Sequence, residues 1–504
     1  MAPLRCSARP DRKGEGPTDT PHGSNGVDFR AVDGKRSSQN AGRAVFSEAA
    51  ASVDASLAAS IARQNEWRKT YLGPVRKIVE AGARSGKDAL RIAGEGLAAV
   101  HHNLVFRRGD EDVSLAEALD APGAGPDLGT GTISGRGARL KEVVVPYRGA
   151  VLRGDGLRRQ LDDWAAAGIV EPSFVRAVSA VVENPGWLDL SGMTFVLLGA
   201  AAEMGPLEWL CRWGADVVAV DLDRPDVWER IGNVANEGSG RVRFPQRDGK
   251  RGADLLAQTP EIAAWLRTFD GPLVVGSYAY ADGSGFLKLA AALDALTVAA
   301  QRDRSDVSIS YLATPTDVFA VPVDVVERSR ARKMAPPSRL TRSVSGGKMF
   351  APNYPELVDG ENGRRWGIAD SLVPQQGPNY ALAKMLQRWR AIAAREEGTL
   401  TSANVAPATR TRSVVKNKIL AAAYRGAPAF GIEIFEPQTS RALLAALLVL
   451  DLRNPAATSR PDAPLDHPFD LFADGAAHGG LWTSAYAPRT VLPLAVAIGA
   501  VKRR

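Results

Sequence analysis

From Leu188 to the C-terminus, short runs of apolar residues alternate with segments of helical periodicity. The apolar runs, which we expect to be strands, are Thr194–Leu198, Asp216–Val220, Leu273–Val275 and Val307–Leu312. Strands that are apolar at nearly every position are buried on both faces, and strands that alternate with helices form parallel sheets. The sequence therefore predicts an α/β fold with a doubly wound parallel sheet covered by helices on both sides.

Composition divides the chain into three predicted regions. Residues 1–43 are rich in Arg, Gly, Ser and Pro, which predicts a disordered tail. Residues 44–190 carry apolar residues three and four positions apart and are expected to be mainly helical. For this region we expect a structural or oligomerising role rather than substrate binding, and the oligomerising alternative implies a homo-oligomer. Residues 191–504 form the sheet domain, with an insertion at about 320–375 whose basic residues indicate either a solvated loop or a substrate lid.

The overall composition argues against several classes of protein. The net charge is +7, but acidic and basic residues are interspersed and no nucleic-acid motif accompanies them, so we expect no nucleic-acid partner. No apolar run reaches the roughly 18 residues that span a bilayer. Cys6 and Cys211 are the only cysteines, and the five histidines lack metal-ligand spacing. We therefore expect no disulfide framework, no bound metal and a cytoplasmic location.

A glycine turn follows the first predicted strand of the sheet domain. Gly199 ends the strand, Gly205 precedes a short helix, and Asp221 ends the second strand about twenty residues after Gly199. This order places backbone N–H groups near a pyrophosphate and an acid near a ribose, as in a Rossmann-like nucleotide-binding domain. Hydride transfer from a nicotinamide cofactor and methyl transfer from S-adenosylmethionine both use this plan, and the first half of the domain does not separate them.

Tyr380 and Lys384 lie four residues apart at the start of a predicted helix, which places the phenol and the ammonium on one face. A cation beside a phenol favours the phenolate and lowers the pKa of the tyrosine towards the range useful for proton exchange. The pattern YxxxK is short, and both residues could equally be ordinary members of an amphipathic helix.

Taken in order, these segments resemble the short-chain dehydrogenase/reductase family over residues 191–455. Chains of that family begin with a glycine turn, then have an acid at the end of the second strand and an Asp after the third strand. The corresponding residues here are Gly199 and Gly205, Asp221, and Asp254. A fifth strand with Ser or Thr, the YxxxK pair and a sixth strand ending in an Asn-x-x-x-Pro-like turn then follow. Similar features occur here at Ile309–Thr314, Tyr380/Lys384 and Ser402–Thr411.

Four features depart from the family pattern. Ala201 replaces the middle glycine of the turn, and Gly276–Tyr280 replaces the usual motif after the fourth strand. The hydroxyl that would bind the substrate oxygen is either Thr314 or Ser310. About forty extra residues precede Tyr380.

The resemblance implies an NAD(P)-dependent oxidoreductase that acts on a carbonyl/alcohol pair. Tyr380 would be the general acid/base, Lys384 would lower its pKa and hold the nicotinamide ribose, and Thr314 would position the substrate oxygen. The basic insertion would suit an acidic substrate or an acyl thioester on a carrier. The alternatives are an S-adenosylmethionine-dependent methyltransferase and a nucleotide-binding scaffold without catalytic activity.

The cofactor would be held by the glycine turn and two acids. Gly199 and Gly205 would contact the phosphates, Asp221 the adenosine ribose, and Asp254 would lie near the adenine. An acid at the end of the second strand repels a 2′-phosphate, so NAD is expected rather than NADP, although Arg224 nearby leaves NADP open.

Overall fold

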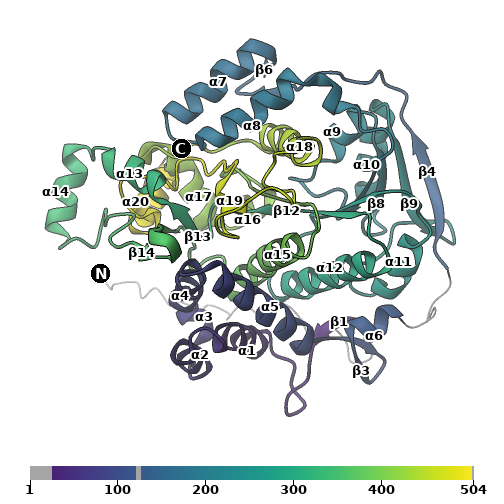
Figure 1. Ribbon diagram of the computed structural model, residues 1–504, viewed down its shortest axis with the longest axis horizontal. Helices are drawn as coiled ribbons and strands as arrows, with labels where there is room; N and C mark the ends of the chain where they lie inside the picture. The colour runs from purple at the N-terminus through teal and green to yellow at the C-terminus, as the bar shows by residue number, and fades with distance from the viewer. Residues whose placement is uncertain (1–24, 121–126, 502–504) are drawn as a thin grey trace, which may run out of the picture.

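The computed structural model describes residues 25–120 and 127–501, which form a mixed α/β structure (Figure 1). Its centre is an eight-stranded sheet in the order β10-β9-β8-β7-β11-β12-β16, with β4 also paired to β9. The strands are β4 (Gly129–Ser134), β7 (Thr194–Leu198), β8 (Asp216–Val220), β9 (Arg241–Arg247), β10 (Lys250–Arg251), β11 (Leu273–Ser277), β12 (Val307–Ala313) and β16 (Thr401–Val405). The strands from β9 to β16 are parallel to one another, whereas β4 and β10 pair with β9 in the antiparallel sense.

Burial on both faces explains why these strands are apolar throughout. In β7, Phe195 and Leu197 belong to one hydrophobic core, whereas Val196 and Leu198 belong to the other. Helices cover both faces (Figure 1): α12 (Ser284–Asp303) and α15 (Pro378–Glu396) lie on one, and α9 (Leu207–Arg212), α10 (Pro225–Glu237) and α18 (Pro437–Arg453) lie on the other. α11 (Thr259–Leu266) packs beside α12. The predicted mixed α/β fold with a mostly parallel central sheet is confirmed.

The N-terminal region packs against the α15 side of the sheet domain (Figure 1). Its elements are β1 (Gly26–Phe29), α1 (Ser38–Ala51), α2 (Ala55–Ala62), α3 (Trp67–Thr70), α4 (Leu72–Ala83), α5 (Gly86–Asn103), β2 (Leu104–Arg108), β3 (Glu111–Ser114) and α6 (Leu115–Asp120). The predicted end of a disordered tail at residue 43 is therefore too late, because β1 pairs with β2 and α1 begins at Ser38. Residues 1–24 of that predicted tail lie outside the described residues.

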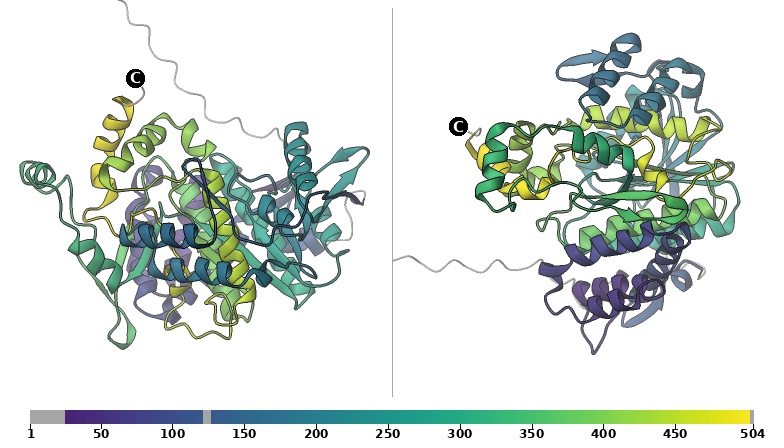
Figure 2. Two further views of the ribbon diagram at one scale, coloured as in Figure 1. Left: turned by 90° about the horizontal axis from the view of Figure 1, so that it is seen from above. Right: turned by 60° about the vertical axis from the view of Figure 1, so that its left-hand side comes forward.

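The region between residues 127 and 190 is divided between two parts of the molecule. The hairpin β5 (Val145–Tyr147) and β6 (Ala150–Leu152), the helices α7 (Gly154–Ala166) and α8 (Pro172–Glu183) and the short η1 (Pro185–Leu188) follow β4. These helices lie on the α18 side (Figure 2), and α8 packs directly on α18. Because β4 is itself a strand of the central sheet, the predicted boundary at residue 190 does not separate two independent cores.

The predicted insertion is folded and has a sheet of its own. It contains β13 (Val318–Pro322), α13 (Val323–Ala331), α14 (Pro336–Val344), β14 (Val358–Asp359), η2 (Glu361–Gly363) and β15 (Arg365–Asp370), with the strand order β13-β15-β14. The C-terminal elements are α16 (Arg412–Lys416), α17 (Lys418–Gly426), η3 (Ala427–Phe430), α19 (Asp470–Ala473) and α20 (Pro488–Val501). Among the described residues, no helix is both long and apolar enough to cross a membrane.

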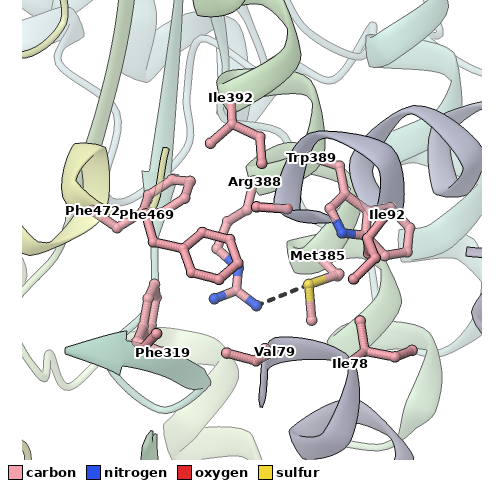
Figure 3. Close-up of a pocket in the computed structure, with 12 residues that line it drawn as sticks. Ile78, Val79, Ile92, Phe319, Met385, Arg388, Trp389, Ile392, Phe469 and Phe472 are labelled. Atoms are coloured by element: carbon pink, nitrogen blue, oxygen red, sulfur yellow. Dashed lines mark hydrogen bonds between the residues drawn. The ribbon is translucent and has the colours of Figure 1, made fainter. Parts of the chain in front are cut away.

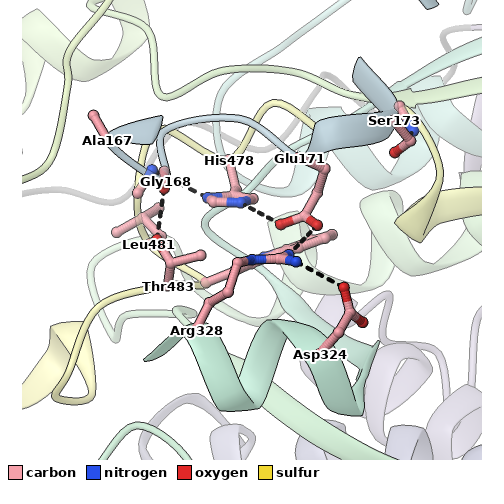
Figure 4. Close-up of polar contacts among 12 residues, drawn as sticks. Ala167, Gly168, Glu171, Ser173, Asp324, Arg328, His478, Leu481 and Thr483 are labelled. Atoms are coloured by element: carbon pink, nitrogen blue, oxygen red, sulfur yellow. Dashed lines mark hydrogen bonds and ion pairs between the residues drawn. The ribbon is translucent and has the colours of Figure 1, made fainter. Parts of the chain in front are cut away.

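A buried ion cluster attaches the insertion to the rest of the chain (Figure 4). Glu171, before α8, accepts a hydrogen bond from His478 Nε2 at 3.0 Å and one from Arg328 of α13, which also pairs with Asp324 at 2.7 Å. The Gly480 N–H donates to His478 Nδ1, so the ring can give its one proton to Glu171 while remaining neutral. Burial lowers the pKa of His478, against the opposing effect of Glu171. The first part of the basic run is therefore structural.

A second contact joins the insertion to α15 and the N-terminal helices (Figure 3). The Arg388 guanidinium of α15 lies 4.5 Å from the centre of the Phe319 ring and donates to the Val318 carbonyl at 2.6 Å. Ile78 and Ile92 of the N-terminal helices line the same small apolar space. α15 is thus packed between the sheet, the insertion and the N-terminal region.

The buried Asp451 joins α18 to β16. Its Oδ2 atom accepts hydrogen bonds from the Ser402 hydroxyl at 2.6 Å and from the Asn404 amide at 2.7 Å. Burial raises the pKa of Asp451 to about 7, although both hydrogen bonds act in the opposite direction. This carboxyl group therefore holds β16 in place. The residues that follow β16 line the large cleft described below.

The first prediction concerns the effect of pH on stability. An unfolded Asp loses its proton near pH 4, whereas native Asp451 keeps its proton to about pH 7. The native state therefore binds more protons between these values, and the free energy of unfolding falls as pH rises across them. Asp451→Asn keeps an acceptor oxygen and removes the titration, so we expect it to reduce this fall by up to about 4 kcal/mol. Denaturant unfolding from pH 4 to 8 measures the free energy of unfolding at each pH, with the surface variant Asp462→Asn as control. Equal slopes for all three proteins would contradict the assignment.

Candidate functional site

The largest cleft lies at the carboxyl edge of the parallel sheet. It has a volume of about 1010 Å³ and is lined by residues that directly follow β7, β8, β11, β12 and β16. Parallel strands all end at the same edge, so their C-terminal loops meet there, and open α/β sheets bind ligands in this position. Six of the seven predicted site residues line the cleft: Gly199, Asp221, Asp254, Thr314, Tyr380 and Lys384.

The turn after β7 needs glycine at its first position. Gly199 has a φ of +88°, and a Cβ atom there would lie 2.4 Å from the backbone of Ala279. Gly205 has a different place: it is buried, it does not line the cleft, and its N–H donates to Ala202 O. The cleft surface is formed instead by residues 201–204, since α9 begins only at Leu207.

Asp221 closes this turn. Its Oδ2 atom accepts the Ala201 N–H at 2.8 Å, and its Oδ1 atom accepts the N–H of Leu222 at 2.9 Å. Burial raises the pKa of Asp221, whereas the two N–H groups and the nearby Arg230 and Arg224 lower it. The carboxylate thus has backbone partners of its own and two basic neighbours.

Asp254 also combines a local structural contact with a position on the cleft. Its Oδ1 atom accepts the N–H of Leu256 at 2.8 Å and that of Ala257 at 3.3 Å. These bonds shape the turn that follows β10. The half-buried side chain lines the cleft on the same side as Asp221.

Tyr380 lies in the first turn of α15 among aromatic rings. The centre of its ring is 5.5 Å from that of Phe286 and 6.5 Å from that of Tyr280. Burial raises the pKa of Tyr380 well above its ordinary value, and a hydrogen bond with the Thr314 side chain partly opposes this. The pKa of Tyr380 therefore shifts in the direction opposite to the one expected from Lys384, because removal of water from the phenol is the largest influence on it.

Lys384 is held by the end of β12. Its Nζ atom donates to the Leu312 carbonyl at 3.0 Å and to Gln387 Oε1 at 3.1 Å. Burial lowers the pKa of Lys384 to about 8, while the buried Asp317 raises it. The ammonium is thus fixed to the strand that carries Thr314, one helical turn from Tyr380.

The two candidate hydroxyl groups lie in different environments. Ser310 is buried, and its Oγ atom is hydrogen-bonded to the Tyr278 hydroxyl at 2.8 Å. Thr314 lies beyond the end of β12 and lines the cleft, with its Oγ1 atom 3.0 Å from that of Thr316. The structure thus brings Thr314, and not Ser310, to the cleft beside Tyr380.

Sequence reasoning missed the contribution of the N-terminal region. Arg68 lines the cleft from α3, and the Tyr71 hydroxyl accepts the Gly377 N–H and donates to the Val373 carbonyl, both at 3.1 Å. These bonds position the segment directly before α15. No local pattern signals them, since about three hundred residues separate the partners.

The insertion contributes little to the cleft. Of its predicted span, only Ser371, Val373 and Gln375 line it. Arg330 donates to the Tyr354 carbonyl, and Arg332 donates to the Ala167 carbonyl, so these basic side chains make internal contacts. A change in its mobility when substrate binds stays a prediction.

Comparisons with protein families, with curated proteins and with solved structures find no match to this chain.

The second prediction tests the turn after β7. Gly199→Ala should lower the free energy of unfolding by about 3 kcal/mol or more, because positive φ strain and a backbone clash add together. Gly271→Ala is the matched control: its φ is +75°, but a Cβ there has nothing within 4 Å. Denaturant unfolding of the two variants separates the clash from the strain. A loss as small for Gly199→Ala as for Gly271→Ala would contradict the close approach of Ala279.

Proposed function

We propose that this protein is an NAD(P)-dependent oxidoreductase that interconverts a carbonyl compound and an alcohol. One observation carries the proposal: the candidate catalytic residues and the candidate nucleotide-binding residues line the same cleft. They are Tyr380, Lys384, Thr314, Gly199 and Asp221. A proton donor, a cation and a small hydroxyl group thus face the edge at which a nucleotide would bind.

The topology supports a Rossmann-like domain. Numbered along the chain, the parallel strands β7, β8, β9, β11, β12 and β16 have the order 3-2-1-4-5-6 across the sheet. This is the order of doubly wound sheets that bind dinucleotides, and the order reverses between β7 and β11, where ligands bind. Gly199 and residues 278–281 follow these two strands and line the cleft.

The residues at this edge fit a dinucleotide in size and charge. Gly199, Ala201 and Ala202 leave room beside the turn, and the basic side chains of Arg224 and Arg230 lie close to Asp221. Because these arginines flank the acid, NADP remains a candidate beside the expected NAD. When bound, the nicotinamide cofactor would supply the hydride.

The chain's own residues would then handle the proton. Reduction of a carbonyl group leaves an alkoxide that must be protonated, and Tyr380, whose raised pKa keeps its hydroxyl protonated, is placed to donate. Thr314, which lines the cleft beside Tyr380, would hold the same substrate oxygen. The Lys384 ammonium would stabilise negative charge that develops on the phenol. Arg68, Arg412 and Lys416 line the cleft and would suit a phosphate-bearing or acyl-thioester substrate.

A binding titration tests the proposal and separates the alternatives. NADH or NADPH should bind, as followed by nicotinamide fluorescence, and S-adenosylmethionine, followed by calorimetry, should not. Binding of S-adenosylmethionine alone would favour a methyltransferase. Absence of binding by all three would reject the nucleotide site.

The third prediction concerns Tyr380. Tyr380→Phe should lower kcat by about two orders of magnitude, the usual effect of losing a general acid, with nearly unchanged affinity for NAD(P)H. Tyr311→Phe is a matched control, because that phenol is buried in β12 and does not line the cleft. An equal loss of kcat in the two variants would reject the role of Tyr380.

The fourth prediction is a pH dependence. The pKa of Lys384 is lowered to about 8, so its ammonium is present below that pH and lost as pH rises through it. We expect kcat/KM to fall above about pH 8. Lys384→Arg keeps its charge throughout this range and should remove that limb of the profile, whatever the activity that remains. A limb at the same pH in Lys384→Arg would assign the titration to another group.

A further inference from the structure

Part of the lining of the cleft is apolar and comes from the C-terminal helices, and we call this part the apolar limb. It is lined by Leu420, Ala423, Phe430, Val491, Leu492 and Ala495, which belong to α17, η3 and α20. Neither the turn after β7 nor the YxxxK pair accounts for this part of the cleft. Its volume is included in the about 1010 Å³ of the whole cleft, which lies at the upper end of the roughly 300–1,000 Å³ of a pocket for one drug-sized ligand.

The wall of this limb is a closely packed pair of helices. A Cβ atom on Gly426 of α17 would lie 1.9 Å from Ala495 O, and one on Gly499 of α20 would lie 1.8 Å from Ala422 O. Arg425 Nε donates to the Gly499 carbonyl at 2.9 Å. Figures 1 and 2 show α17 and α20 side by side at one end of the molecule. Helices in such contact form a fixed wall, so the limb is a built part of the cleft.

The limb begins at the proposed reacting groups. Tyr424 of α17 lines the cleft and lies close enough to Tyr380 to affect its pKa. The rings of Tyr280 and Phe286 flank Tyr380 from the other side. A substrate whose oxygen lies at Tyr380 would therefore have these aromatic rings beside its reacting carbon and the limb ahead of its chain.

Two of the polar side chains near the limb have hydrogen-bond partners within the protein. The Tyr486 hydroxyl donates to the Phe430 carbonyl at 3.1 Å, and the Ser484 hydroxyl accepts the Tyr486 N–H at 3.4 Å. Burial raises the pKa of the half-buried Tyr424 hydroxyl to about 12, so this group stays neutral. The limb thus offers a ligand mainly apolar contacts.

We propose that the limb lined by α17, η3 and α20 binds the hydrocarbon chain of a straight-chain acyl substrate whose carbonyl group lies at Tyr380. This assignment rests on the proposed function for the location of the carbonyl group. Arg412 and Lys416 lie on exposed α16 and line the same cleft, where they would meet a phosphate-bearing carrier of the acyl group. A buried chain gains about fourfold in affinity for each methylene group.

Chain-length dependence of binding tests the assignment without requiring turnover. Displacement of a fluorescent fatty-chain probe would be measured with saturated aldehydes and with the matching acyl thioesters of 4, 8, 12 and 16 carbons. Affinity should rise by at least tenfold from 4 to 12 carbons in both series. A higher affinity of the thioesters over the aldehydes would assign the carrier-bound form, and the reverse would assign the free aldehyde. Affinity independent of length would overturn the proposal.

Two variants locate the chain. Ala423→Phe and Leu492→Trp fill the limb and should weaken binding of the 12- and 16-carbon ligands by at least tenfold, with little effect on the 4-carbon ligand. Ala497→Phe, on the exposed side of α20, is the matched control. Unchanged long-chain binding in both limb variants would also overturn the proposal. Length-dependent binding without NAD(P)H binding would leave the limb assigned and reject the oxidoreductase.

Discussion

Burial of the central strands on both faces is the constraint from which the site follows. Because β7, β8, β11 and β12 supply side chains to two cores, they run parallel and are connected by helices that return over the sheet. Parallel strands end at one edge, so segments far apart in sequence must meet there. Gly199, Asp221 and Thr314 need no contact with one another to share a cleft: each only has to follow a buried strand.

This logic explains what sequence reasoning could and could not predict. β7 and β8 have the predicted bounds because four consecutive apolar residues in each leave little choice of structure. β9 was missed because Arg241, Arg243 and Arg247 interrupt its apolar positions. Two of these arginines pair with Asp216 of β8, so tertiary contacts satisfy charges that argue against a strand. The N-terminal boundary was wrong for the same reason, since β1 depends on pairing with β2 about eighty residues later.

The site was predictable in position but not in electrostatics. Spacing placed Tyr380 and Lys384 on one helix face, and strand order placed Thr314 opposite them. Their protonation depends on burial, which periodicity does not report. α15 is covered by the sheet, by α12 and by the N-terminal α5, and the resulting loss of water acts on Tyr380 and Lys384 in opposite directions along the pKa scale. Desolvation favours the neutral form of each group, so the phenol keeps its proton while the ammonium approaches neutrality near pH 8.

Segments outside the central sheet also contact α15 or its neighbours. Tyr71 binds the segment before α15, Arg388 joins α15 to β13, and Glu171 holds α13 through Arg328. Each contact crosses between regions distant in sequence, and the first two attach α15 directly to its neighbours. A general acid must stay within hydrogen-bond reach of its substrate, where small displacements cost much of its effect. The N-terminal helices and the insertion therefore act on the proposed chemistry mainly by holding Tyr380 and Lys384 in place, whereas α17 and α20 shape what lies in front of them.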